Sequence, residues 1–329
     1  MYCSQFYAIS LLQISVKWNG VEVETSSVDK SYPFKSMIDC QFSFNDVAKN
    51  TYMSAWGWLD DLPASCANFA KTPTAADGEE QPPPSGYDKR MAHIAESRSF
   101  FMQTPLFSDV FFQNRALVPG VAMEIGLTLN PPEFFLISAD TNRNKFALKL
   151  ESCELKIRTV EPIKEVVNDI NKALVGGKAA LYPITKSSVV FHTVPKQQVV
   201  HISNLLKGIF PSTIILGFLP DTALSSQLST NPMRFQSFGL KQCQIYANGK
   251  PLFNRILDFQ DDDHLRAFMK IQEDLCLNSS SNSITFTKEM MTHQYFFWTV
   301  DLTGMGFFFG VALGMGVGDE ADAYTFLLF

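Results

Sequence analysis

Residues 14–23, Ile-Ser-Val-Lys-Trp-Asn-Gly-Val-Glu-Val, alternate apolar and polar side chains on either side of an Asn-Gly pair. Residues 243–252, Cys-Gln-Ile-Tyr-Ala-Asn-Gly-Lys-Pro-Leu, repeat this arrangement in the second half of the chain. Each stretch predicts a tight β-hairpin, because Asn and Gly both accept the positive φ of a type I′ turn. The two pairs lie too far apart for a solenoid repeat. They indicate two related β domains in tandem.

The composition is that of a globular chain with a β tendency. Of the 329 residues, 46% are hydrophobic, 29 are Phe, and 17 are Pro. Short apolar runs separated by Pro are typical of all-β sandwiches. The net charge of −6 argues against bulk electrostatic attraction to nucleic acid. No basic region precedes an apolar one at the start, so we expect no cleaved signal peptide.

The first half alternates between strand-like and irregular segments. Residues 31–58 are rich in aromatic side chains and are expected to be partly helical, whereas the Pro-rich, acidic stretch at 60–90 reads as a disordered insertion. Strands are predicted at 121–129, 146–150 and 153–160. The first of these strands should carry one apolar face, formed by Val121, Met123, Ile125, Leu127 and Leu129.

Residues 161–177 predict a helix between the two halves, because their apolar residues recur with helical spacing between Pro162 and Gly176. After it, strands are expected at 187–194, 197–202, 212–219, 238–246, 283–287 and 295–301, with a loop over 221–232.

These elements predict an all-β fold of two tandem jelly-roll sandwiches joined by a helix. The expected divisions are a first jelly roll over 1–160, a linking helix over 161–180, and a second jelly roll with an atypical C-terminal tail over 181–329. Few residues precede the first hairpin, so the first jelly roll is expected to be truncated at its N-terminus. The exposed edges of an incomplete jelly roll predict aggregation or poor expression.

The sequence carries no recognised catalytic, cofactor-binding or metal-binding motif, and we expect no enzyme activity. His192, His201 and Cys243 are weak metal candidates, because no two of them have the spacing of a ligand pair. The run Asp261 to His264 is interpreted as a solvated turn rather than a cation site. Arg115 is either an interface anchor or a buried edge residue.

Two further features have ordinary explanations. The mixed charges between Arg143 and Arg158 are those of a strand face, not of a nucleic-acid site. The uncharged stretch from Leu302 to Gly318 contains six Gly and favours buried β structure or an apolar tail over a membrane span. The six Cys form no Cys-x-x-Cys pair and are expected to be buried free thiols.

Several motifs, taken in order, resemble the double jelly-roll, hexon-like major capsid proteins of Polinton/Maverick elements and adintoviruses. In the first half, these are Val16 to Gly20 followed by Ser31-Tyr-Pro-Phe-Lys35, and Asp109-Val-Phe-Phe-Gln-Asn-Arg-Ala-Leu-Val-Pro-Gly-Val121. In the second half, they are Tyr182-Pro-Ile184, Phe218-Leu-Pro-Asp221, Asn231-Pro-Met-Arg-Phe235, Tyr246-Ala-Asn-Gly249 and Phe297-Trp-Thr-Val-Asp-Leu-Thr303.

The resemblance implies a structural major capsid protein of an icosahedral double-stranded DNA virus or virus-like element, possessing no active site. Homotrimeric, pseudo-hexagonal capsomers would contact neighbouring capsomers and a minor (penton) capsid protein. The chain would reside in the virion and be intracellular during assembly. Two alternatives remain: a two-domain β-sandwich binding module for carbohydrate or a protein partner, and a cupin-type enzyme, which would require clustered His and carboxylate ligands.

Overall fold

The computed structural model describes twelve segments of the chain. They are residues 10–25, 30–59, 86–138, 147–195, 197–206, 211–252, 256–259, 264–277, 284–293, 295–303, 311–317 and 324–328.

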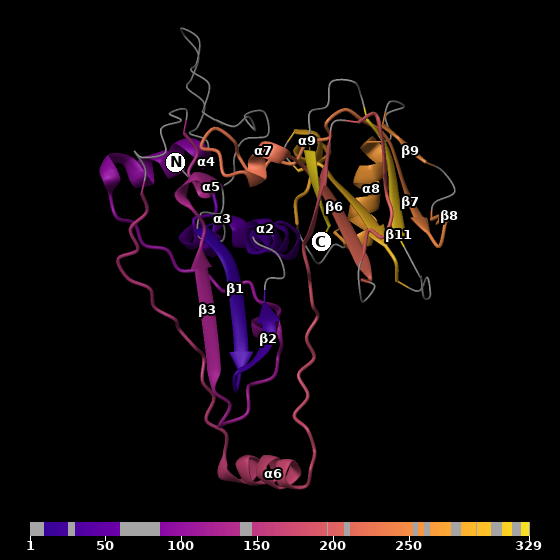
Figure 1. Cartoon of the computed structure of the whole chain (residues 1–329). Helices are drawn as coiled ribbons and strands as arrows, with labels where there is room; N and C mark the ends of the chain where they lie inside the picture. Colours follow the sequence, from indigo (N-terminus) through magenta and orange to yellow (C-terminus); the bar gives the residue numbers. More distant parts are fainter. Residues whose placement is uncertain are drawn as a thin grey trace.

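The first half is built on a three-stranded antiparallel sheet with the order β2-β1-β3. Its strands are β1 (Leu11–Trp18), β2 (Val21–Thr25) and β3 (Met123–Leu129). Its helices and 3-10 turns are α2 (Ser31–Ser43), α3 (Asp46–Asn50), η1 (Tyr52–Trp56), α4 (Gly86–Ile94), η3 (Ala95–Ser97), η4 (Asp109–Phe112) and α5 (Pro132–Phe135). Helix α6 (Lys164–Val175) stands away from both halves, at the end of two extended arms (Figure 1).

The second half contains two antiparallel sheets. One has the order β10-β6-β12-β4, and the other has the order β5-β11-β7-β8 with β9 also paired to β7. The strands are β4 (Val190–Val194), β5 (Val199–Ile202), β6 (Thr213–Pro220), β7 (Leu240–Ala247), β8 (Lys250–Pro251), β9 (Leu257–Asp258), β10 (Phe297–Asp301), β11 (Val311–Val317) and β12 (Tyr324–Leu328). The helices are α7 (Asp221–Leu224), α8 (His264–Asp274) and α9 (Lys288–His293).

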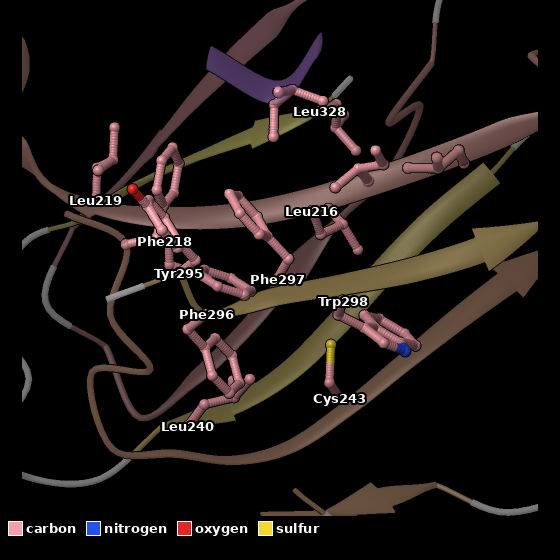
Figure 2. Packing of buried hydrophobic residues seen from close by; sticks show 14 of the residues in the cluster. Leu216, Phe218, Leu219, Leu240, Cys243, Tyr295, Phe296, Phe297, Trp298 and Leu328 are labelled. Carbon is pink, nitrogen blue, oxygen red and sulfur yellow. The ribbon is translucent and has the colours of Figure 1, made fainter. Parts of the chain in front are cut away.

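The two sheets of the second half enclose an apolar core between them. Trp298 of β10 and Cys243 of β7 point toward one another, and both are almost fully buried (Figure 2). The next residue along β10, Phe297, lies on the other face of the four-stranded sheet, where its ring is 4.6 Å from that of Phe235. This sheet is therefore buried on both faces, which explains why the first four residues of β10 are all buried.

Gly217 of β6 is required by that packing. A Cβ atom at this position would lie 2.7 Å from the Phe235 ring and 2.9 Å from the Phe297 ring. Only glycine lets the two rings approach the strand this closely.

Both predicted Asn-Gly hairpins are confirmed, and they are alike in detail. Asn19 and Gly20 have φ values of 49° and 76°, and Asn248 and Gly249 have values of 50° and 75°. In each case a helix follows the hairpin, α2 in the first half and α8 in the second.

The ladders around the two hairpins also match. Trp18, just before the first turn, lies opposite Met123 at the start of β3. Ala247, just before the second turn, lies opposite Val311 at the start of β11. Each long strand has an irregularity at the same distance from its turn, between Leu11 and Gln13 in β1 and between Leu240 and Gln242 in β7. The sheet β2-β1-β3 is therefore the counterpart of β8-β7-β11.

The stretch from Leu302 to Gly318 contributes a buried strand, which agrees with the first of its two expected alternatives, buried β structure rather than an apolar tail. Its described part, β11, lies between β5 and β7, and β12 then lies between β4 and β6. The end of the chain thus supplies an inner strand to each sheet of the second half. No helix within the described segments combines the length and apolarity needed to cross a membrane.

Other expectations need correction. The chain is not all-β, because helices such as α2, α4, α6 and α8 accompany the sheets. The insertion predicted at 60–90 ends earlier, since Gly86–Ile94 is helical, and residues 60–85 lie outside the described segments. The loop predicted at 221–232 begins with the short helix α7.

Three predicted strands, at 146–150, 153–160 and 283–287, do not form in the part of the chain that the structure describes. Residues 147–163 form an extended connection without regular hydrogen bonding, and Phe146 lies outside the described residues. Residues 284–287 lead into α9 without forming a strand. Alternating side chains give a segment the potential for strand structure, but a strand forms only where an edge is available to pair with it.

The contribution of β11 to the core can be tested at matched positions. Met315 of β11 is 3% exposed, whereas Leu127, its counterpart on β3, is 39% exposed. We expect Met315→Ala to lower the free energy of unfolding by about 2–5 kcal/mol. In the separated chain, Leu127→Ala should change it by about 0.5 kcal/mol or less. Urea denaturation of both variants measures the difference, and equal effects would contradict the burial of β11.

Candidate functional site: the junction between the two halves

Helix α2 belongs to the cores of both halves. Tyr32 and Cys40 lie in the apolar cluster around the first sheet. Phe34, Met37 and Ile38 lie in the cluster of the second-half sandwich. Most of the helix is buried, including the polar residues Lys35 and Gln41. The helix therefore joins the two halves into one packed unit, and Figure 1 shows it lying between them.

The Tyr32-Pro-Phe-Lys35 motif supplies the contacts at the start of this helix. The backbone N–H of Phe107 donates a hydrogen bond of 3.1 Å to the hydroxyl oxygen of Tyr32. Phe34 packs edge-to-face against the rings of Phe191 and Phe235, at 5.6 and 6.2 Å between centroids. Alternate residues of one short motif thus face opposite halves of the molecule.

Lys35 forms the centre of a buried ionic cluster. Its Nζ atom lies 2.6 Å from Oδ1 of Asp109 and 3.3 Å from Oε1 of Glu24, and the three side chains are each only 10% exposed. Asp109 also accepts hydrogen bonds from Ser187, 2.8 Å from the backbone N–H and 2.9 Å from the hydroxyl. The cluster thus connects β2, α2 and η4 to the start of the second half.

Glu24 is held by the turn that begins at Ser108. Its carboxylate accepts hydrogen bonds from the Ser108 hydroxyl at 2.5 Å and from the backbone N–H groups of Asp109 and Val110 at 3.0 Å each. Burial alone would raise the pKa of Glu24, but these hydrogen bonds and the charge of Lys35 together lower it. Glu24 is therefore held as a carboxylate.

The pKa of Asp39, one helical turn after Lys35, shifts in the opposite direction to that of Glu24. Burial, with the neighbouring charges of Asp109 and Glu24, raises its pKa to about 6, although Lys35 acts in the other direction. Three carboxyl groups thus surround a single ammonium group. Protonation of Asp39 relieves the excess negative charge.

Additional side chains cross the junction. The Nζ atom of Lys30 donates to the hydroxyl of Ser226 at 2.9 Å. Asp46 accepts a hydrogen bond of 3.1 Å from the backbone N–H of Thr285. These contacts extend the junction along the length of α2 and into α3.

A second group of contacts ties the Tyr182-Pro-Ile184 motif to the first half. The Tyr182 hydroxyl accepts a hydrogen bond of 3.0 Å from the backbone N–H of Val118, and its ring lies 5.2 Å from that of Trp18. Arg115 donates through Nη1 to the carbonyl oxygen of Leu181 at 2.5 Å. Arg115 is exposed, so it is not the buried edge residue of the second interpretation, and it anchors a contact within the chain.

The structure does not bring the weak metal candidates together. Cys243 lies opposite Met315, while His201 lies opposite Gly314, one residue along the same strand β11. Successive residues of a strand point to opposite faces, so Cys243 and His201 do so as well. His192 is on β4 of the other sheet and contacts the carbonyl of Leu205 at 3.3 Å. Within the described segments, no group of three or more His, Cys, Asp or Glu is placed to hold a metal ion.

The remaining candidates are placed as follows. Asp261, Asp262 and Asp263 lie outside the described residues, and the His264 ring lies 5.1 Å from that of Phe259. Arg143 also lies outside them, and residues 151–158 are exposed.

The expectation of buried thiols is met for only some cysteines. Burial raises the pKa of Cys40 and Cys243 well above the usual thiol range, so both are poor nucleophiles. Cys153 and Cys276 are exposed and form no disulfide, so the expectation of burial is wrong for these two. Cys3 and Cys66 lie outside the described residues.

Sequence reasoning missed the ionic cluster, although two of its members lie in quoted motifs. Lys35 ends the Ser-Tyr-Pro-Phe-Lys motif, and Asp109 begins the next one. Nothing in the local pattern around Glu24 or Ser187 pairs them with these residues. No protein-family model matches this chain, and no curated protein matches it.

Removal of the central cation tests the cluster. Lys35→Met would leave Glu24 and Asp109 buried without their counter-charge, and we expect a loss of about 3–5 kcal/mol in unfolding free energy. Lys172→Met is the matched control, because Lys172 is 80% exposed and 3.9 Å from Asp169. The control should change stability by no more than about 0.5 kcal/mol. Similar losses in the two variants, measured by urea unfolding, would contradict a stabilising role of Lys35 in the buried ionic cluster.

The pKa of Asp39 predicts a pH dependence. Its folded pKa of about 6 is above the ordinary value of 3.8, so its stabilising contribution is complete below pH 3.8 and is lost as the pH rises through 6. Relative to Asp39→Asn, the wild-type protein should lose on the order of 3 kcal/mol between pH 4 and pH 7. Glu24 shifts in the opposite direction, but it is present in both proteins.

Unfolding free energies of both proteins at pH 4, 5, 6 and 7 measure this effect. The exposed variant Asp169→Asn serves as the control and should show no such slope relative to the wild type. A pH-independent difference between the wild type and Asp39→Asn would disprove the assignment.

Proposed function

We propose that this chain is a structural capsid protein of the double jelly-roll type, whose copies assemble into trimeric capsomers of an icosahedral shell around double-stranded DNA. The observation that carries the proposal is the repeated ladder: the arrangement β2-β1-β3 reproduces β8-β7-β11 in pairing, in turn conformation and in the position of the strand irregularity. Two copies of one sheet in a single chain are what a double jelly roll requires.

The connectivity of the second half supports the jelly-roll assignment. Along the chain, β4, β6, β10 and β12 join the four-stranded sheet. Strands β5, β7, β8 and β11 form the main path of the other sheet, and the two-residue strand β9 also pairs with β7. The path crosses repeatedly between two facing antiparallel sheets, as in the two Greek keys of an eight-stranded jelly roll. In the first half, the described residues supply only the counterparts of β7, β8 and β11.

The junction is consistent with an assembly role. A packed helix and a buried ionic cluster hold the two halves together, so the chain presents them to its neighbours as one block. The proposal identifies further copies of the chain and a minor capsid protein as partners, and the virion as the location after intracellular assembly. It assigns no active site, cofactor or specific nucleic-acid site.

The mass of the purified chain in solution tests the proposal. We expect a homogeneous species of three times the 36.9 kDa chain mass, measured by light scattering after size exclusion. The trimer should persist across a tenfold dilution series. A monomer at every concentration would contradict the proposal and favour the two-domain binding module.

A further inference from the structure

The first sheet exposes a row of apolar side chains, whereas the corresponding row in the second half is buried. Leu127 and Leu129 of β3 lie opposite Ile14 and Leu11, which are buried under α2. Nevertheless, Leu127 is 39% exposed and Leu129 is 46% exposed. The cover over β1 therefore reaches Met123 and Ile125 but does not extend over the last residues of β3.

The corresponding residues of β11 show which contacts β3 lacks in the described structure. Met315 and Val317 of β11 occupy the same ladder positions in the second half, and each is only 3% exposed. They are sealed within the sandwich core, where β11 also has a neighbouring strand on each side. In the part of the chain that the structure describes, β3 pairs only with β1. Its other edge corresponds to the position that β5 fills beside β11.

The chain also carries an amphipathic segment that pairs with no strand. In residues 153–160, Cys-Glu-Leu-Lys-Ile-Arg-Thr-Val, apolar and charged side chains alternate from Cys153 to Arg158. These residues form no strand in the described structure. Leu155 and Ile157 are 54% and 58% exposed. Each copy thus possesses both an unpaired strand edge and an unpaired segment with strand periodicity, which is the condition for exchange between copies.

We propose that residues 153–160 of a second copy of this chain add to the open edge of β3 as an antiparallel strand. The pairing that we assign places Leu155 opposite Leu127 and Ile157 opposite Ile125. It also places Arg158 opposite Glu124, so that an exposed cation faces an exposed carboxylate.

Alternative registers are less favourable. A shift by one residue would turn Glu154 and Lys156 onto the apolar row. A shift by two in one direction would place Arg158 opposite Gly126, so the charge pair would be lost. A shift by two in the other direction would bring Leu129 opposite Glu151. The assigned register alone places Cys153 opposite Leu129, covers the apolar row and keeps the charge pair.

We assign the added strand to a second copy because, within its own chain, the segment forms no ladder with β3 in the described structure. Its Lys156 donates to Oε1 of Gln103 at 3.3 Å, and residues 147–163 continue along the arm toward α6 (Figure 1). This inference rests on the self-association in the proposed function and names the contact that produces it. A head-to-tail contact of this kind closes into a ring when three copies are related by rotation.

A single substitution tests the register. Leu129→Cys places a thiol opposite Cys153, which is already an exposed free thiol. Paired strands bring such residues within disulfide range. After oxidation with diamide, we expect dimers and trimers linked by disulfide bonds on a non-reducing denaturing gel, with the 129–153 link identified by peptide mass spectrometry.

Two controls make the result specific. Leu129→Cys combined with Cys153→Ser retains every other cysteine and should lose at least nine-tenths of the linked product. Leu127→Cys faces Leu155 in the assigned register and should link to Cys153 at least tenfold less efficiently than Leu129→Cys. Equal linking at both positions would overturn the register.

The outcomes separate this inference from the proposed function. A trimer by light scattering without the 129–153 link would overturn the inference and leave the function standing. A 129–153 link confined to monomers would show pairing within one chain and would likewise overturn it. Linked dimers that never form trimers would support the exchange and contradict the trimeric capsomer.

Discussion

The four-stranded sheet of the second half is apolar on both faces, and the need to cover its outer face organises the rest of the molecule. The Phe297 side chain lies on that face and packs against Phe42 of α2 and against Phe235, which in turn contacts Phe34 of α2. The same helix closes the core of the first sheet. One helix thus forms the interior of two cores, and the halves cannot be separated without exposing both. A helix buried in this way retains no solvated face for its charges. Lys35 therefore requires internal partners, which Glu24 and Asp109 provide. The same two carboxylates, together with burial, disfavour the ionised form of Asp39 and raise its pKa to about 6.

The two copies of the hairpin show that one local structure can occupy two different tertiary environments. Their turns, pairing and strand irregularity agree, yet β11 is an inner strand and β3 is an edge strand with exposed leucines. The burial of a strand depends on the elements that pack on its faces and pair with its edges, and not on the hydrogen-bond pattern within its own hairpin. Under the proposed assembly role, this exposed edge would supply surface for contacts between copies.

Much of the local structure was predictable. The hairpins followed from Asn-Gly between alternating runs, and α6 from helical spacing between Pro162 and Gly176. Strand β6 followed from an apolar run that opens with β-branched residues. Residues 153–160 show the limit of such reasoning, since their alternation is as clear as that of β1. Strand periodicity specifies which side chains share a face, but the partner edge lies elsewhere in the chain. The ionic cluster was not predictable for the same reason, because Glu24, Lys35, Asp109 and Ser187 come from four separate segments.

The sequence by itself determined the turns, the register near them, and the candidate repeat, because these depend on φ preferences and side-chain spacing over a few residues. Only the tertiary structure decided that α2 joins the two cores, that the chain's last strands occupy inner positions, and that Lys35 neutralises carboxylates from distant segments. These features depend on packing and on the removal of charge from water. Both effects arise only when segments that are remote in sequence meet.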